Sequence, residues 1–341
     1  MIQATGRRTL GKRKATALAV LVAALLVLIA VSSCPLMTLA SLRQVDDHPL
    51  YVMRYYGPYT SDLLLRSGLE KTIYQRLRQM AMPEACTCFA GLSTEGDKVF
   101  GRNFDWQDHA ALMLFTDPPN GYASVSMVDI YYLGYDEEGP SDIGRAALLL
   151  APYLPFDGMN EAGLAVGMMA VPHARGSEDS QKPTVDSLRV IRVLLDEASS
   201  TEQAVSLLRE YNVVFAGPPL HYLISDASGN SAVVEFIDGQ MNVITNKDPW
   251  LVATNFLLTE VEPDGASSPC GRYNETYEAL TAAAGNVSPS EAMAILQRVS
   301  APNTIWSAVY DMTTGAIRLV VGRDYDRPLE FHLQMDGATP E

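Results

Sequence analysis

The sequence predicts an α+β protein in which antiparallel sheets are covered by layers of helices. Strand-like runs come in pairs that are joined by turn residues, as at 226–230 and 313–315. Helix-like runs come in separate blocks and do not alternate with single strands, which argues against a repeated βαβ unit. The sequence also shows no glycine-rich phosphate loop, no metal-ligand spacing and no internal repeat.

Hydrophobic periodicity places the individual elements. Strands are predicted at 86–92, 98–104, 122–128, 163–170, 221–226, 231–237, 250–254, 305–311 and 316–322. Helices are predicted at 184–199, 201–211, 272–284 and 289–299. The last helix opens with Ser288, Pro289 and Glu291, which form a capping box with proline at the first helical position.

The first 34 residues predict a signal peptide or a membrane anchor. They contain five basic side chains and no acidic one, and an apolar or weakly polar run follows at 15–31. This order is typical of an export signal and predicts that the body is exported. The run has 17 residues, whereas a bilayer needs about 20. It ends at Val31-Ser32-Ser33-Cys34, which resembles the lipobox of bacterial lipoproteins, so a lipid anchor at Cys34, a single transmembrane helix and secretion after cleavage all stay open.

Residues 35–85 form a spacer or propeptide, and 86–341 form the body. An amphipathic helix is predicted at 61–80, although Gly68 weakens it. The body is acidic, because the chain after residue 34 holds 40 acidic and 20 basic side chains. Such a charge argues against binding nucleic acid through its phosphates. A composition of 48% hydrophobic and 19% charged residues excludes wholesale disorder.

The segment at 85–106 carries the chemistry. Two short apolar runs flank turn residues at 93–97, which predicts a β-hairpin. A turn centred near Glu95 places Cys86 opposite about position 104. Cys86, Arg102 and Asp105 then meet at the open end of the hairpin, as a candidate nucleophilic site.

These residues resemble the choloylglycine hydrolase group of N-terminal nucleophile hydrolases. The resemblance rests on Cys86-Thr87 and on Gly101-Arg102-Asn103-Phe104-Asp105, and it extends to the segments at 158–164, 254–255, 267–273 and 304–311. It implies a four-layer αββα sandwich and hydrolysis of a linear, non-peptide amide without a cofactor. It adds Asn255 and Arg272 to the site, and it implies that these proteins often form homo-oligomers.

The resemblance also implies the role of each residue. Cys86 becomes the first residue of the mature enzyme, its thiol attacks the carbonyl carbon, and its α-amine shuttles the proton. An α-amine, with a pKa of roughly 7.7–8.0, is a suitable base near neutral pH. Arg102 favours the thiolate and Asp105 orients the amine. Asn255 donates to the oxyanion, and Arg272 holds Asp105 or a substrate carboxylate.

This chemistry requires cleavage between Ala85 and Cys86, which would separate the body from any anchor unless the two pieces stay associated. Spacing alone does not choose Cys86 over Cys88, which could both be small core residues. His221 is expected to be structural, and the methionines and tyrosines near 131–132, 159 and 168–169 are expected in the core. Ala170 stands where bile salt hydrolase has a second oxyanion-side Asn, which weakens a specific expectation of bile salts.

Two other functions stay open. The acyl group could pass to an amine instead of water, which would make the protein an acyltransferase. The chain could also be an inactive, anchored binding module on the same fold. The acyl group itself is not predicted, and the partner we expect is a small N-acyl amide.

Overall fold

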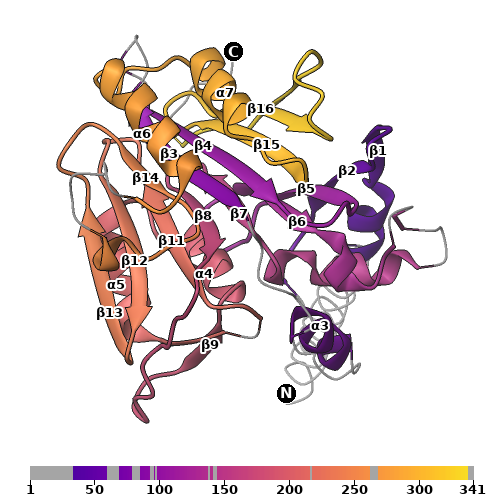
Figure 1. Cartoon of the computed structure of the whole chain (residues 1–341). Coiled ribbons are helices and arrows are strands. Elements are labelled where there is room, and N and C mark those ends of the chain that lie inside the picture. Colours follow the sequence, from indigo (N-terminus) through magenta and orange to yellow (C-terminus); the bar gives the residue numbers. More distant parts are fainter. Residues whose placement is uncertain are drawn as a thin grey trace, which may run out of the picture.

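Two β-sheets, packed face to face and covered by helices, make up the computed structural model (Figure 1). The structure describes residues 34–59, 69–78, 85–92, 96, 98–136, 139–140, 144–215, 217–261 and 268–336. Residues 1–33 of the predicted leader at 1–34, residues 61–68 and 79–80 of the predicted helix at 61–80, and most of the hairpin turn at 93–97 lie outside these residues.

The large sheet contains nine strands in the order β1-β2-β5-β6-β7-β8-β11-β12-β13. Their bounds are β1 Arg43–Asp46, β2 Leu50–Tyr55, β5 Ala111–Thr116, β6 Ser124–Asp129, β7 Asp157–Asn160, β8 Ala165–Ala170, β11 Leu220–Ser225, β12 Ser231–Ile237 and β13 Gln240–Thr245. Neighbours are antiparallel except for β2 and β5, which run parallel. The expectation of antiparallel sheets is therefore confirmed, except for this pair and for a separate two-stranded sheet of residues 184–186 and 212–214.

The small sheet contains six antiparallel strands in the order β14-β3-β4-β15-β16-β17. Their bounds are β14 Leu251–Ala253, β3 Cys86–Leu92, β4 Lys98–Asp105, β15 Thr304–Asp311, β16 Ala316–Val321 and β17 Leu329–His332. The strands predicted for this sheet are confirmed to within about two residues, as expected for strand ends.

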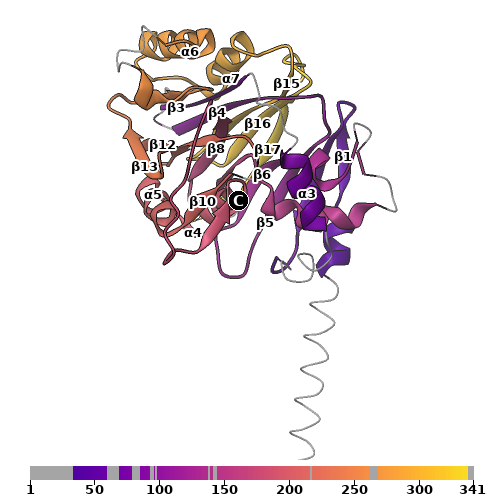
Figure 2. The ribbon, with the colours of Figure 1, turned by 60° about the horizontal axis from the view of Figure 1, so that its bottom comes forward.

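Helices cover the outer faces of both sheets. Helices α6 (Gly271–Ala282) and α7 (Pro289–Arg298) pack on the small sheet, whereas α4 (Arg189–Glu197) and α5 (Thr201–Glu210) pack on the large one. The turned view shows the two helix pairs on opposite sides of the sheets, with β1 and α3 (Leu69–Arg78) together at one end (Figure 2). The capping box at Ser288 and Glu291 is present.

One helix prediction is wrong at its start. Residues 184–186 form strand β9, which pairs in parallel with β10 (Asn212–Val214), and α4 begins only at Arg189. The carboxylate of Asp186 accepts hydrogen bonds from the backbone N–H groups of Leu188 and Arg189. These bonds hold the turn between β9 and α4, and the pairing of β9 with β10 keeps residues 184–186 extended.

Short 3₁₀ helices complete the described part of the chain, at η1 Ile130–Leu133, η2 Arg145–Tyr153 and η3 Leu258–Glu260. None of the described helices is both long enough and apolar enough to cross a membrane. Cys34 opens the helical stretch at 34–40, where its side chain lies beside Gly57.

Alternation along β3 divides its side chains between two cores. Cys86 and Cys88 face the core between the sheets, while Phe89 faces the core beneath α6 and α7. The sheets approach so closely at this point that a Cβ on Gly167 of β8 would lie 2.8 Å from the Sγ atom of Cys88. The first residue of β3 is therefore held between both sheets.

Candidate active site

The hairpin of β3 and β4 places Cys86 directly opposite Phe104. The register predicted from the turn is thereby confirmed. Directly opposed residues of an antiparallel pair share a face, so Cys88 lies beside Arg102. Asp105, at the end of β4, lies on the other face, toward the helix layer. The hairpin end thus presents a guanidinium on the thiol side and a carboxylate on the helix side.

Arg102 is fully buried between the sheets and has a carboxylate partner there. Its Nε atom lies 3.4 Å from Oδ2 of Asp157 on β7. The same carboxylate accepts from Trp306 Nε1 at 2.9 Å and from the Tyr310 hydroxyl at 2.5 Å. Burial alone would lower the pKa of Arg102, yet its interactions with Cys86, Cys88 and Asp157 raise that pKa above its usual value. The guanidinium is therefore a fixed positive charge beside the two thiols.

Asp105 is also fully buried. One oxygen, Oδ1, accepts a hydrogen bond from the Thr304 hydroxyl. The other, Oδ2, lies 3.8 Å from Nη1 of Arg272 and has no hydrogen-bond partner among the described residues. Burial raises the pKa of Asp105, while Thr304, Arg272 and Arg102 act in the opposite direction. Oδ2 is thus a buried acceptor with capacity for one more donor.

Arg272 joins the hairpin end to the loop after β14. Its Nη1 donates to the Cys86 carbonyl at 2.5 Å and to Thr87 Oγ1 at 3.2 Å, and its Nη2 donates to Asn255 Oδ1 at 3.1 Å. A guanidinium only donates, so this contact fixes the amide of Asn255 with Oδ1 toward Arg272. Asn255 Nδ2 then donates to the Ala170 carbonyl at 2.9 Å, and among the described residues its second hydrogen has no acceptor.

The pairing of β14 with β3 places Asn255 beside Cys86. Ala253 pairs with Cys88, so the next residue of the same alternation, Asn255, comes level with Cys86. Asn255 is half-buried and the Arg272 side chain is 20% exposed, while Cys86 is fully buried. The cluster therefore reaches the surface at Asn255 and Arg272.

A second buried network supports the segment that carries Asn255. His221 Nε2 lies 2.7 Å from the Thr254 carbonyl, and His221 Nδ1 lies 3.3 Å from Glu235 Oε1. Glu235 also accepts from the backbone N–H groups of Leu258 and Thr259 and from the Thr259 hydroxyl. Burial would raise the pKa of Glu235, but His221, Thr259 and Leu258 outweigh it, and the pKa lies below its usual value. His221 is structural, as expected.

The two neighbouring cysteines have different surroundings. Cys88 lies deep between the sheets, where burial raises its thiol pKa to about 12 in spite of Arg102. Cys86 begins the strand beside Asn255 and Arg272, and Ala85 before it is buried as well. None of the four cysteines forms a disulfide bond in the described part of the chain. The position at the strand start is therefore the one whose carbonyl binds Arg272 and whose thiol lies near Arg102.

The structure brings all five predicted site residues together: Cys86, Arg102, Asp105, Asn255 and Arg272. Sequence reasoning missed Asp157, Thr304 and Glu235, which hold Arg102, Asp105 and the Asn255 loop. A signal existed for Asp157, since it directly precedes the segment at 158–164 that carried the resemblance. Met159, Met168, Met169 and Tyr132 are buried in the core as expected, whereas Tyr131 is only half-buried against it.

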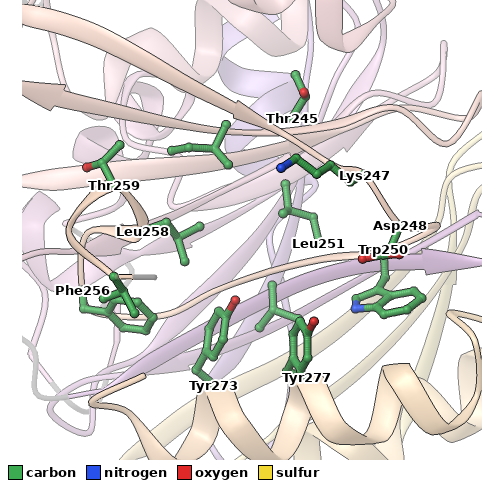
Figure 3. A pocket seen from close by; sticks show the side chains of 13 residues that line it. Thr245, Lys247, Asp248, Trp250, Leu251, Phe256, Leu258, Thr259, Tyr273 and Tyr277 are labelled. Atoms are coloured by element: carbon green, nitrogen blue, oxygen red, sulfur yellow. The ribbon is translucent and has the colours of Figure 1, made fainter. Parts of the chain in front are cut away.

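The residues described by the structure contain no group of three or more His, Cys, Asp or Glu side chains that could hold a metal ion. A cavity of about 330 Å³ lies outside the cluster, between β13, β14, η3 and α6 (Figure 3). Trp250, Phe256, Tyr273 and Tyr277 line it, with Lys247 at one side. None of the five predicted site residues lines this cavity, although Phe256 and Tyr273 are the chain neighbours of Asn255 and Arg272.

Comparison with known proteins agrees with this fold. A mutant of the conjugated bile acid hydrolase from Clostridium perfringens has the same fold, with a TM-score of 0.55 and 18% identity over 73% of this chain and 92% of that one. Penicillin V acylase from Agrobacterium tumefaciens follows with a TM-score of 0.50 and 21% identity, over 70% and 83% of the two chains. These similarities define the class of fold.

The family of the protein follows from a match at the level of sequence. The family model described as linear amide C–N hydrolases, choloylglycine hydrolase family, matches residues 86–256. The protein therefore belongs to the choloylglycine hydrolase family. It is 26% identical over 194 residues to penicillin V acylase of Pectobacterium atrosepticum, which is 51% of this chain and 50% of that enzyme. The match thus spans about half the length of the curated relative.

Proposed function

We propose that the protein hydrolyses a linear, non-peptide amide, with Cys86 as the nucleophile after cleavage of the bond between Ala85 and Cys86. The observation that carries the proposal is the cluster at the start of β3, where a thiol lies beside a buried guanidinium and a buried carboxylate. The family match, which begins at Cys86, supports the same first residue for the mature chain.

Cleavage would complete the cluster. In the uncut chain the nitrogen of Cys86 is an amide, which cannot act as a base. As a free α-amine it has a pKa near neutrality and additional hydrogens to donate. Oδ2 of Asp105 is buried without a hydrogen-bond partner among the described residues, and it lies 3.8 Å from the Arg272 Nη1 atom that also binds the Cys86 carbonyl, so we propose it as the acceptor for that amine. An amine held there would satisfy the carboxylate and be oriented by it.

The reaction then proceeds in two halves. The α-amine takes the proton of the Cys86 thiol, and the thiolate attacks the amide carbon. Asn255 donates its second Nδ2 hydrogen to the oxyanion. The amine passes its proton to the leaving nitrogen, the C–N bond breaks, and an acyl-thioester remains. Water attacks that thioester while the amine accepts its proton, which releases the acid and restores the thiol.

Arg102 and Arg272 have separate roles in this proposal. Arg102 favours the thiolate, because it lies on the thiol face with its charge fixed by Asp157. Arg272 holds the Cys86 carbonyl and the Asn255 amide in place. Its partly exposed side chain could also bind a substrate carboxylate.

The decisive experiment determines the N-terminus of the purified protein and its activity together. Edman sequencing and intact mass should show a chain that begins at Cys86, and that chain should release the amine from a panel of chromogenic N-acyl substrates. A persistently uncut, inactive chain would favour the binding module instead. Adding a competing amine and analysing the acyl product separates hydrolysis from acyl transfer.

We also propose that the protein acts outside the cytoplasmic membrane. The support is the basic and apolar sequence before residue 34 and the acidic body that follows. Membrane-fraction blots of the wild type and of Cys34→Ala test the form of attachment. Loss of the protein from the membrane fraction in the variant supports a lipid anchor, and unchanged retention supports an uncleaved helix.

A further inference from the structure

We propose that residues 34–55 are a permanent part of the folded protein, so that a chain cut before Cys86 becomes two chains that stay bound to each other. The inference rests on the proposed cleavage and concerns the N-terminal piece that cleavage would produce. The segment that binds the body is therefore part of this same chain. The surface that it occupies is the edge of β5 in the large sheet.

The backbone contact is continuous. β2 lies between β1 and β5, and its register with β5 runs without a break from Leu50 opposite Ala111 to Tyr55 opposite Thr116. The N–H of Ala111 also donates to the Pro49 carbonyl at 2.9 Å. Strand addition of this kind satisfies the backbone groups of both partners along their whole length.

The side chains of β2 are buried on both faces of the strand. Leu50, Val52 and Met53 are at most 5% exposed, and Arg54 is the one exposed residue of the strand. A strand that is buried on both faces belongs to the interior of a fold, not to a removable edge. Without β2 the wholly buried strand β5 would become a bare apolar edge, which is an aggregation hazard.

Residues of the body that lie far from β5 also contact this segment. Two glycines of the body leave room for its side chains: a Cβ on Gly139 would lie 2.5 Å from the Tyr51 hydroxyl, and one on Gly322 would lie 2.4 Å from the His48 ring. The Tyr55 hydroxyl donates to the Leu149 carbonyl at 3.4 Å. These contacts reach parts of the chain far from β5, so the segment is fitted on several sides.

Helix α3 provides a second point of attachment closer to the cleavage site. Arg76 donates to the Tyr131 carbonyl at 2.5 Å and lies over the Tyr131 ring, 4.5 Å from its centroid. Ile73 and Leu77 of the helix are buried as well. The N-terminal piece is therefore attached to the body both at β2 and at α3, and whatever anchors that piece would also anchor the enzyme.

A doubly tagged full-length chain tests the proposal. Once the C-terminal chain is shown to begin at Cys86, native capture by the C-terminal tag should recover both chains in equal amounts. Capture in concentrated guanidinium chloride should recover the C-terminal chain alone. A native capture that yields a folded, active C-terminal chain without its partner would overturn the proposal.

A second experiment tests the association of the two pieces independently of whether the protein cleaves itself. A wild-type chain that is never cut contradicts the proposed function and leaves the association to be measured in another way. For that purpose a protease site is placed between Arg78 and Ala85 in the Cys86→Ala variant, and the folded protein is cut from outside. The N-terminal chain should again be co-captured, and its loss after this cut would overturn the association.

Urea titration of the cut protein locates the binding surface. Met53→Ala should lower the urea concentration at which the N-terminal chain is released, because it removes a fully buried side chain of β2. Arg43→Ala, at an exposed position of β1, is the matched control and should leave that concentration unchanged. Equal release curves for the two variants would contradict the assignment to β2.

Discussion

Two buried clusters of charged side chains lie within the fold, and they differ in how well their hydrogen bonds are satisfied. Around Glu235, the carboxylate accepts from His221, Leu258 and Thr259. Around Cys86, Oδ2 of Asp105 and Nη2 of Arg102 have no hydrogen-bond partner among the described residues. A buried unpaired polar atom costs roughly 1–3 kcal/mol.

This difference in hydrogen bonding indicates that the Glu235 cluster supports the fold, whereas the Cys86 cluster is suited to a reaction. The Glu235 carboxylate supports the loop that carries Asn255, and its acceptor sites are occupied by the bonds that do so. The unsaturated cluster keeps acceptor and donor capacity beside a thiol, which is the property that a reaction site requires. The following predictions test this contrast, beginning with the largest effect.

Cys86→Ala should abolish amide hydrolysis, with a loss of at least about 10⁴-fold in kcat, while the far-ultraviolet circular dichroism spectrum stays unchanged. Cys88→Ala is the matched control, because its thiol is held protonated between the sheets. It should keep most of the activity. An inactive Cys88→Ala beside an active Cys86→Ala would reverse the assignment.

Asp105→Asn should lower kcat by about 10²–10⁴-fold, because an amide cannot hold the Cys86 amine as a carboxylate does. Cleavage before Cys86 should slow as well, which the ratio of cut to uncut chain in intact mass spectra measures. Thr304→Val removes only the hydroxyl that binds the other oxygen and should have a smaller effect. Equal losses in the two variants would show that the unpaired oxygen has no special role.

Asp157→Asn should destabilise the fold by about 3 kcal/mol, because it leaves the Arg102 guanidinium buried without a carboxylate. Urea unfolding measures the loss. The double variant Arg102→Met, Asp157→Leu should cost less than the two single changes added together, since the pair is removed as a unit. Strict additivity would contradict a direct pairing.

Glu235→Gln should cost about 2 kcal/mol of unfolding free energy at pH 7. The folded-state pKa of Glu235 is lowered, so its contribution is present above its unfolded value of about 4.3 and is lost as the pH falls through the folded-state pKa. The urea curves of variant and wild type should therefore converge in acid. Glu260→Gln, at an exposed pair with His173, is the control and should differ little at any pH.

Tyr277→Ala should change kcat/KM less than about 2-fold, since the cavity that it lines holds none of the five cluster residues. The loss of a half-buried ring should cost about 1 kcal/mol in stability. A large rise in KM with unchanged kcat would instead show that the acyl group binds in this cavity. That result would show that the substrate site reaches from the Cys86 cluster past the Asn255 loop into this cavity.

The sequence predicted the elements whose signals are local. The β3–β4 hairpin and helix α7 are specified by a turn and by a capping box, and both formed as predicted. Strands β5 and β7 were missed, because short buried runs carry no clear alternation. Asp157 and Thr304 were missed for another reason. Their partners lie 55 and 199 residues away. Asp157 directly precedes the segment at 158–164 and Thr304 opens the segment at 304–311, but neither segment indicates which distant side chain each residue contacts.

The distances along the chain within the cluster have a consequence for folding. Arg272 reaches Cys86 across 186 residues, and Thr304 reaches Asp105 across 199. Contacts that close loops of more than half the chain form late and slowly. A nascent or truncated chain therefore carries the thiol without the groups that surround it. The site therefore assembles only after the chain has been made as far as Thr304.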